Sequence, residues 1–313
     1  MNAVEEHLAT RRAAGLFDFS FMSLCEVTGA GARAFLETLQ TRLVAALEPG
    51  RIAYTLLLRE DASVFIDATL WRHDDERWWL FTGRRSDIAW IAARADGFDV
   101  HLRDRSGEFA ILALQGPRSS DLVGARPPYF HFAEAKVEGV PAWVGRLGFS
   151  GELGVEILVP AAARTALRDR LRDRGAYECG FDAADSLRIE SGYILFSNEL
   201  SCMPDPFELG LGRLVTGSAF AGAEALRKRR FAGLRRKLVG LVPIGSTRAA
   251  GSLPEAQLTS EAWSPIFARQ LGIGFAPAED AAPGTLVRLA DDRIARCARL
   301  PFYDPGRVRP RRI

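Results

Sequence analysis

The chain has 313 residues, of which 48% are hydrophobic and 26% are charged, and its formal net charge is +2. This composition is ordinary for a globular protein and leaves room for two or three domains. So small a net charge gives no general electrostatic reason to expect nucleic-acid binding. No stretch approaches the roughly 20 apolar residues that span a bilayer, so we also expect no membrane contact.

The chain has four cysteines and four histidines, and both sets are dispersed: Cys25, Cys179, Cys202 and Cys297; His7, His73, His101 and His131. No spacing among them indicates a metal site, a disulfide framework or a Ser-His-Asp triad. Residues 1–12 are charged and lack the apolar core of a signal peptide. We therefore expect reduced thiols and a cytoplasmic protein.

The first third of the chain alternates helical and strand patterns. We expect a short helix at 1–14, a strand region at 15–27 and a helix at 29–43 that closes before Pro49-Gly50. The elements expected next are strands at 52–58, 64–71 and 78–82, a helix at 86–94, and strands at 99–102 and 109–115.

The remaining pattern is also mixed, and it ends in short strands. We expect a helix near Ser119, strands at 141–147 and 155–159, helices at 161–174 and 182–192, a loop at 198–210, and strands at 238–243, 257–259, 271–276, 286–289 and 294–300. Short strands at this spacing are typical of a small barrel or sandwich. The fold class that this pattern predicts is α+β with an all-β C-terminal part.

Asp67 is the most informative single residue, because it lies inside the apolar run 64–71 that predicts a buried strand. An unpaired charge there costs several kcal/mol, on the order of its desolvation penalty. Perturbed buried carboxylates concentrate at functional sites, although structural ion pairs also produce them. From this residue alone, a structural role and a catalytic role are equally good interpretations.

A glycine-rich turn at 148–154 leads into a strand that contains a second isolated acid, Glu156, between Val155 and Ile157. Strand alternation places Glu152, Gly154 and Glu156 on one face. A hairpin with solvated acids is the simpler interpretation, because most hairpin acids face water. The glycines would also permit a ligand to approach the backbone closely.

Segment 182–192 predicts a helix that ends at Gly192, and Arg188 lies in it between two aliphatic residues. Asp185 is three residues earlier and can pair with Arg188 along the helix. Alternatively, the guanidinium can bind a carboxylate or a planar heterocycle of a ligand. Further on, the basic run 226–237 predicts a solvated charged helix, with a docking patch for an acidic partner as the alternative.

Taken in order, a series of segments resembles the aminomethyltransferase family, which comprises the T-protein of the glycine cleavage system and its folate-dependent relatives. The segments are 16–20 ("GLFDVS" in the family), 49–58 ("PG…YTLLL"), 113–117 ("ALQGP"), 148–157 ("GYTGEDGFEI"), 185–192 ("DSLRLEAG"), 207–215 ("EAGLGWLV") and 259–265 ("TSG…SP"). Each motif is weak alone, but their order over nearly the whole chain is specific.

The resemblance implies a three-domain cloverleaf ring around a central funnel that holds tetrahydrofolate. The domains implied are 1–27 with 109–209, 28–108 with 210–235, and a C-terminal β-barrel at 236–313. The resemblance makes Asp67 the catalytic residue near N10 of the folate, and Glu156 an acceptor for the pterin ring, with Glu152 as the weaker choice. It also makes Arg188 a residue that fixes the pterin and Tyr54 an aromatic residue near the folate.

Several segments depart from the family pattern. The family's double acid "DD" is Ile66-Asp67, its "TND" is represented by 41–43 with Arg42 in the middle, and its "VVNA" is represented by 81–84 with Gly83 in place of Asn. The family's "DVSHM" loses its His at Phe21. These changes lie on the substrate side of the implied site, so they leave folate binding in place and bear on the choice of donor.

The resemblance therefore implies a tetrahydrofolate-dependent aminomethyltransferase that acts without a metal, as a monomer. Its donor would be an aminomethyl group on the lipoyl arm of an H-type carrier protein. One alternative is a tetrahydrofolate-dependent demethylase of a small O-, S- or N-methyl compound. Another is a non-catalytic folate-binding protein, although the segment 191–199 lacks the "KGCYxGQE" motif of the family branch that supports iron–sulfur enzymes.

Overall fold

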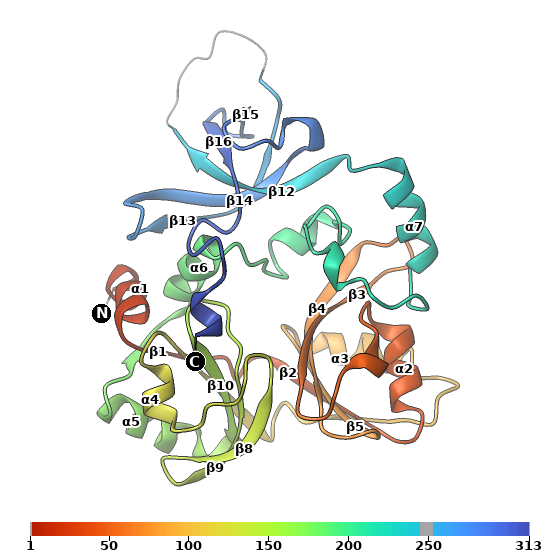
Figure 1. Cartoon of the computed structure of the whole chain (residues 1–313), viewed down its shortest axis with the longest axis vertical. Coiled ribbons are helices and arrows are strands. Elements are labelled where there is room, and N and C mark those ends of the chain that lie inside the picture. The colour runs from red at the N-terminus through yellow and green to blue at the C-terminus, as the bar shows by residue number, and fades with distance from the viewer. Residues whose placement is uncertain (1, 245–252, 313) are drawn as a thin grey trace.

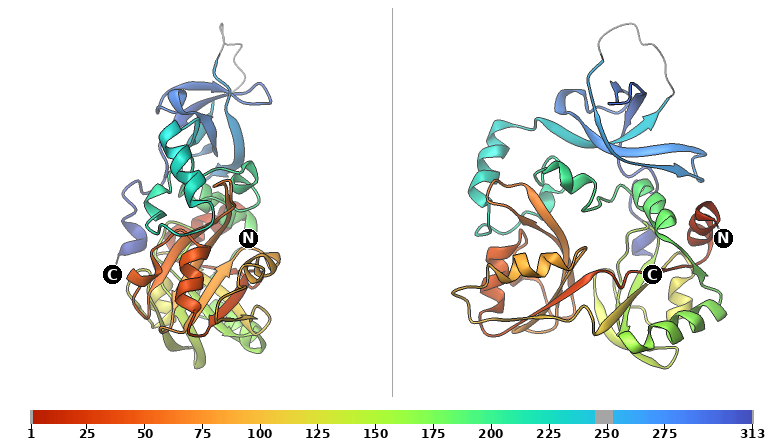
Figure 2. Two further views of the ribbon diagram at one scale, coloured as in Figure 1. Left: turned by 90° about the vertical axis from the view of Figure 1, so that its right-hand side faces the viewer. Right: turned by 180° about the vertical axis from the view of Figure 1, so that it is seen from behind.

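The computed structural model describes residues 2–244 and 253–312 and arranges them around three β-sheets (Figure 1). Each sheet forms the centre of one lobe, and the three lobes surround a common middle region (Figure 2). In the described residues, no helix is long and apolar enough to cross a membrane. The mixed helix and sheet content confirms the predicted α+β class.

The first sheet has the strand order β11-β1-β7-β10-β9-β8. Its strands are β1 (Gly15–Asp18), β7 (Phe109–Gln115), β8 (Phe132–Val137), β9 (Val140–Gly145), β10 (Gly154–Pro160) and β11 (Tyr177–Glu178). Helices α4 (Ser119–Val123) and α5 (Arg164–Asp173) pack their leucines on one face of this sheet. The other face receives α6 (Phe181–Glu190), against which α1 (Ala3–Arg12) packs.

The second sheet has the order β3-β4-β5-β2-β6. Its strands are β2 (Ser23–Thr28), β3 (Ile52–Leu58), β4 (Val64–Arg72), β5 (Arg77–Thr82) and β6 (His101–Asp104). Helices α2 (Ala32–Leu39) and α3 (Ser86–Ala92) cover one face through apolar residues at helical spacing, including Phe35, Leu36 and Leu39.

The third sheet has the order β13-β14-β12-β16-β15. Its strands are β12 (Arg236–Pro243), β13 (Gln257–Ser264), β14 (Arg269–Pro277), β15 (Leu286–Arg288) and β16 (Ile294–Ala298). An isolated parallel bridge between Glu255 and Arg288 connects the chain just before β13 to β15. The described residues otherwise form a five-stranded sheet with two edges, so the closed C-terminal barrel stays a prediction.

The linking segments are short. Helix α7 (Ala223–Ala232) leads into β12. Other links contain short 3-10 helices: η1 (Val44–Ala46), η2 (Ala161–Ala163), η3 (Glu199–Cys202), η4 (Gly212–Leu214), η5 (Ala278–Asp280) and η6 (Arg309–Arg311). The basic run predicted as one helix is split between α7 and β12. Its arginines and Lys228 lie at the surface on α7, as the solvated interpretation expected.

Two further differences from the predicted elements have local causes. The strand region predicted at 15–27 is two strands in different sheets, because residues 19–22 form a turn in which Met22 N–H donates to the Phe19 carbonyl (3.0 Å). Strand β8 was not predicted, because its exposed positions interrupt the apolar pattern. The domain boundaries stay a prediction, and the sheet pairing places Ser23–Thr28 with the second sheet.

The first two sheets meet through an aromatic layer between their inner faces. Trp71, Trp79 and Phe81 of the second sheet pack against Phe132 and Leu158 of the first. Gly145 on β9 permits the closest approach, since a Cβ there would lie 2.2 Å from the Trp71 ring. This contact holds β4 beside β9 and fixes how the two sheets face each other.

A buried ionic cluster around Arg11 of α1 ties the first lobe to the third sheet and to the C-terminal tail. Arg11 donates through Nη2 and Nε to Glu190 of α6 (2.7 and 3.2 Å), and its Nη1 lies 3.3 Å from Glu152. The guanidinium also stacks 3.8 Å from the Tyr303 ring centre, and the Tyr303 hydroxyl donates to Glu152 (2.8 Å). His7 and Ser264 also contact Glu190. The cluster therefore joins α1, α6, the 148–154 turn, β13 and the C-terminal tail.

Removing Arg11 should strongly destabilise the protein, because Glu152 and Glu190 are buried and would lose their shared cation. We expect Arg11→Leu to lower the free energy of unfolding by about 3–5 kcal/mol, the usual cost of breaking a buried ion pair from one side. Urea denaturation measures it. The matched control is Arg12→Leu on the same helix, where the arginine is exposed. Equal midpoints for the two variants would contradict the role given to the cluster.

Candidate functional site

Asp67 lies on β4, and Figure 1 shows this strand on the side of the second lobe that is nearest the middle of the molecule. Residues 65, 67 and 69 are half-buried and alternate with fully buried neighbours, as strand geometry requires. Asp67 is opposite Leu56 on β3, and Tyr54 is opposite Thr69. Tyr54 is thus a diagonal neighbour of Asp67 on the same face, and its hydroxyl donates to Asp67 Oδ2 (3.0 Å).

The carboxyl group of Asp67 is poorly solvated even though the residue keeps some accessible surface. Burial raises the pKa of Asp67 to about 6, against the opposing effects of the Tyr54 hydrogen bond and the Arg84 charge. Burial and the neighbouring Asp67 carboxylate also raise the pKa of Tyr54, so its hydroxyl stays protonated and donates. In the described residues, Asp67 has no ion pair with a cation. Its negative charge is therefore available to a ligand.

Glu156 lies on β10, in register with Ala113 of β7 and Gly145 of β9. Its strand neighbours Val155 and Ile157 point into the core of the first sheet, so Glu156 points to the opposite face. No hydrogen bond or ion pair engages its carboxylate within residues 2–244 and 253–312. Burial raises the pKa of Glu156 to about 7. Glu156 is half-buried by accessible surface, and its carboxyl is less solvated than the hairpin interpretation expects.

A chain of contacts connects the two carboxylates across the sheet interface. Gly145, the partner of Glu156 in the ladder, packs against the Trp71 ring. The Trp71 indole donates to the Thr69 hydroxyl (3.3 Å), and Thr69 is opposite Tyr54 in the neighbouring strand. Glu156 and Asp67 therefore lie on strands of two sheets that pack against each other at Gly145 and Trp71, and such a rigid support is what a precise site requires.

Glu152 is in a different environment from Glu156. It is 3% exposed, and its oxygens accept from Arg11, Tyr303 and Arg309. The turn that carries it folds tightly over Gln115: a Cβ at Gly148 or Gly154 would lie 2.0 or 2.3 Å from the Gln115 amide. The glycines of this motif therefore permit close packing with Gln115, and Glu152 belongs to the ionic cluster around Arg11.

Arg188 lies near the end of α6, is 5% exposed and makes several polar contacts. It donates to Asp185 (2.7 Å), as the helical spacing indicated, and also to Glu199 (3.0 Å), the Tyr193 carbonyl (3.2 Å) and the Ser260 hydroxyl (2.7 Å). These contacts use most of the guanidinium N–H groups, of which an arginine has five.

Glu199 is the residue in this cluster that the sequence patterns did not single out. It is fully buried, and besides Arg188 it accepts from the hydroxyls of Thr259 and Ser260 (both 2.6 Å) and from the Leu195 N–H (2.8 Å). The Thr259-Ser260 motif thus has a structural partner in η3. The "TSG"-like motif was the one sequence signal near this contact. It could not identify Glu199, because η3 and residues 259–260 are far apart in the chain.

Gly83, one of the positions that depart from the family pattern, packs directly against an aromatic ring. A Cβ at Gly83 would lie 2.4 Å from the Phe196 ring, so the aromatic ring occupies the space that a side chain at this position needs. Arg84 lies over the rings of Phe65 and Phe196 (5.0 and 5.5 Å to their centres), and Phe65 precedes Asp67 by two residues on the same face. An aromatic and cationic wall near Asp67 therefore replaces the family's Asn.

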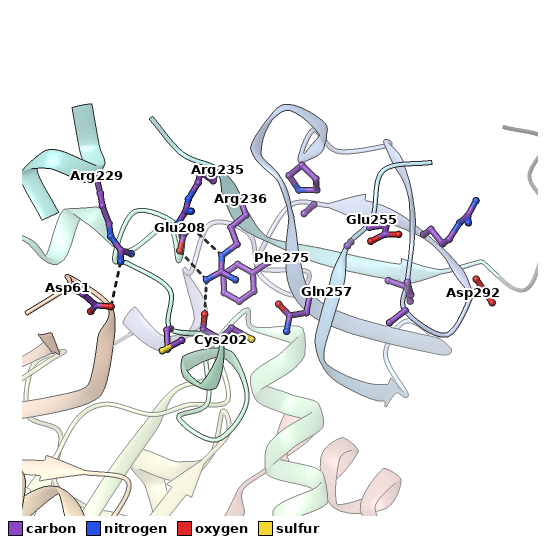
Figure 3. Close-up of a pocket in the computed structure, with 17 residues that line it drawn as sticks. Asp61, Cys202, Glu208, Arg229, Arg235, Arg236, Glu255, Gln257, Phe275 and Asp292 are labelled. Atoms are coloured by element: carbon purple, nitrogen blue, oxygen red, sulfur yellow. Dashed lines mark hydrogen bonds and ion pairs between the residues drawn. The ribbon is translucent and has the colours of Figure 1, made fainter. Parts of the chain in front are cut away.

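A separate pocket of about 830 Å³ lies between the third sheet, η3 and the β3–β4 turn (Figure 3). Its charged lining residues are Arg229, Arg235, Arg236 and Arg288, with Asp61, Glu208, Glu255 and Asp292. Arg236 pairs with Glu208 (3.2 Å), and the opposite charges balance. None of the residues predicted for the site lines this pocket. In the described part of the chain, no group of His, Cys, Asp or Glu side chains is arranged to hold a metal ion.

Arg188 and Glu199 should be strongly coupled, because each is buried against the other. We expect Arg188→Ala to lower the free energy of unfolding by about 3 kcal/mol, since it leaves the Glu199 carboxylate buried without its cation. Adding Glu199→Gln to that variant should recover part of the loss, and urea denaturation of the two single variants and the double variant measures the coupling. Additive effects would show that the pair is not coupled.

Comparison with known proteins agrees with this arrangement. Residues 1–218 match the family model described as the GCVT N-terminal domain. The chain is 34% identical to an aminomethyltransferase of Symbiobacterium thermophilum, over 96% of this chain and 89% of that protein. It is 35% identical to an aminomethyltransferase of Geobacillus kaustophilus, over 96% of this chain and 90% of that protein.

A solved structure is similar over nearly the whole chain. The crystal structure of the glycine cleavage system aminomethyltransferase T from Bartonella henselae superposes with a TM-score of 0.87 at 29% identity, covering 97% of this chain and 90% of that one. The fold of the two chains is therefore the same, including the arrangement of the three lobes. With the matching family model and relatives, this shows that the chain belongs to the GCVT family of aminomethyltransferases.

Proposed function

We propose that the protein is a tetrahydrofolate-dependent aminomethyltransferase whose central site is built on Asp67 and Glu156. The observation that carries the proposal is a pair of desolvated carboxylates that have no cation partner among the described residues, on two sheets that pack against each other, in a chain of this family. The chain pairs its other buried acids with arginine, as at Glu152, Glu190 and Glu199. Two exceptions on facing sheets support a site for a ligand.

Asp67 acts on the reacting centre. Its carboxylate orients N10 of the folate and stabilises cationic character on the one-carbon unit as it is transferred. Such stabilisation is stronger where water is excluded, and the raised pKa of Asp67 reports this environment. Tyr54 positions the carboxylate by its hydrogen bond. The folate accepts the carbon, and the protein supplies position and charge.

Glu156 accepts hydrogen bonds from the pterin ring. A pterin edge presents an N–H and an amino group side by side, which a carboxylate can accept in parallel. This role suits Glu156 better than Glu152, whose oxygens already accept from Arg11, Tyr303 and Arg309. Arg188 remains the proposed residue beside the pterin, because one N–H of its Nη2 has no partner among the described residues.

We propose the one-carbon donor from the family to which the chain belongs. An aminomethyl group on the lipoyl arm of an H-type carrier protein would yield 5,10-methylenetetrahydrofolate and ammonia, in a cytoplasmic protein acting as a monomer. The Phe196 ring packed at Gly83 favours a second candidate, a demethylase of a small methylated compound, because it alters the wall beside Asp67. Turnover with each class of donor distinguishes the two.

Asp67→Asn should abolish transfer and retain folate binding. The amide can still accept from Tyr54, but it lacks the charge, so we expect a loss of at least about 100-fold in the transfer rate. Methylenetetrahydrofolate formation from aminomethylated carrier protein measures the rate, and calorimetry measures folate affinity. Asp61→Asn, an exposed acid in the turn before β4, is the matched control. Unchanged turnover in Asp67→Asn would exclude the catalytic assignment.

Tetrahydrofolate binding should strengthen as the pH rises from about 6 to 8. The pKa of Glu156 is raised to about 7, so the carboxylate that accepts from the pterin is protonated below this pH. Calorimetric titration of the wild-type protein across this range should show the change, and Glu156→Gln should bind weakly at every pH. Glu134→Gln, an exposed acid on β8 of the same sheet, should behave like the wild type. A flat profile for the wild type would remove Glu156 from the site.

A further inference from the structure

Two chain segments beside Asp67 are connected by hydrogen bonds. After α2, the Thr41 carbonyl accepts from the N–H groups of Thr216 (3.0 Å) and Gly217 (2.9 Å), and the Leu43 N–H donates to the Thr216 hydroxyl (2.9 Å). The connected segments therefore hold two arginines near each other: Arg42 between Thr41 and Leu43, and Arg213 in η4.

The same segments adjoin the strand pair that carries Asp67. The Thr41 N–H donates to the carbonyl of Leu56 (3.0 Å), and Leu56 is the residue opposite Asp67 in the ladder. The turn η4 packs against β3, and the Arg213 charge opposes the rise in the pKa of Tyr54. Both arginines therefore lie on segments that adjoin β3, the strand that carries Tyr54.

Neither guanidinium has a hydrogen bond, an ion pair or a stacked aromatic ring in the described residues. Arg42 is half-buried and Arg213 is exposed. Burial lowers the pKa of Arg42, and the charge of Arg213 lowers it further. By contrast, Arg11 and Arg188 in the neighbouring clusters have carboxylate partners. Close, unpaired like charges are unfavourable, and an anion between them removes the repulsion.

A polar atom at the same turn is also unsatisfied. The Thr41 hydroxyl is fully buried and has no hydrogen-bond partner within residues 2–244 and 253–312. Buried polar groups without partners are uncommon in folded proteins and call for an explanation such as a bound ligand or ordered water. The turn thus combines an unsatisfied hydroxyl with two cations, in place of the uncharged Asn and Trp of the corresponding family segments.

We propose that Arg42 and Arg213 bind a carboxylate of a ligand in the site beside Asp67. Guanidinium groups suit this chemistry because they bind carboxylates through paired N–H donors. The inference rests on the proposed function for the location of the ligand. The carboxylate has two possible sources: the glutamate tail of tetrahydrofolate, or an acidic group on a separate one-carbon donor.

Calorimetry with three probes tests the proposal and separates the two sources. The probes are tetrahydrofolate, 6-methyltetrahydropterin, which has the pterin but no glutamate, and glutarate added with saturating 6-methyltetrahydropterin. The proteins are the wild type, the double variant Arg42→Gln/Arg213→Gln, and the control Arg33→Gln, an exposed arginine on α2.

If the tail is bound, the double variant should lose about 10- to 100-fold in affinity for tetrahydrofolate, the scale of lost charged hydrogen bonds. Its affinity for 6-methyltetrahydropterin should stay within about twofold of the wild type by the same argument. If a donor carboxylate is bound, tetrahydrofolate affinity should not change, but glutarate binding should be present in the wild type and lost in the double variant.

Equal affinities of the wild type and the double variant for tetrahydrofolate and for glutarate would overturn the proposal. Failure of the wild type to bind either pterin probe would instead overturn the proposed function. In that case glutarate alone still tests the arginine pair, since its binding by the wild type and not by the double variant would support the anion site. Absence of glutarate binding to both proteins would then reject it.

Discussion

The ionic cluster centred on Arg11 is the contact on which the placement of the third lobe against the first depends. One guanidinium serves two buried carboxylates, Glu190 on α6 and Glu152 on the 148–154 turn, and it stacks on Tyr303 from the C-terminal tail. Burial alone would raise the pKa of Glu190, but its hydrogen bond with His7 and the charge of Arg11 outweigh burial and lower it. Because none of these groups can be left alone in the interior, segments from both ends of the chain must come together around α6.

Helix α6 is anchored a second time by Arg188, which connects it to η3 and to β13 of the third sheet through Glu199 and Ser260. The two clusters do not involve β4 and β10, the strands that carry Asp67 and Glu156, and neither carboxylate has a cation partner among the described residues. Both carboxyls have raised pKa values, of about 6 and about 7. Each therefore opposes folding more strongly as the pH rises from the ordinary carboxyl range through its own pKa, because the folded state disfavours the ionised form. The free-energy cost of two such carboxylates, in a protein that pairs its other buried acids, is characteristic of a ligand-binding site.

Much of this could be predicted from the sequence. The charge of Asp67 inside an apolar run predicted both its strand and its unusual environment, and the period of the α2 segment predicted its buried face. The choice between Glu152 and Glu156 was harder, since alternation places them on one face and says nothing of what that face contacts. Arg11, Tyr303 and Arg309 lie more than 130 residues from Glu152 along the chain, and in the described residues they contact Glu152 but not Glu156. For Arg188, the helical spacing predicted Asp185 but not Glu199 or Ser260, because those partners come from other elements.

The fold class, the family and the succession of most helices and strands follow from the sequence, which also singles out Asp67, the acid for which we propose a catalytic role. Those features depend on local periodicity and on residue types at fixed spacing, and both can be read along the chain. Only the tertiary structure decided which charges neutralise one another and which remain free. Neutralisation depends on distances of a few ångström between residues that are remote in sequence, such as Arg11 and Glu190 or Arg188 and Ser260. Packing also leaves Glu156, Arg42 and Arg213 without ionic partners among the described residues. Whether a charged side chain is neutralised inside the protein or stays available to a ligand therefore depends on packing.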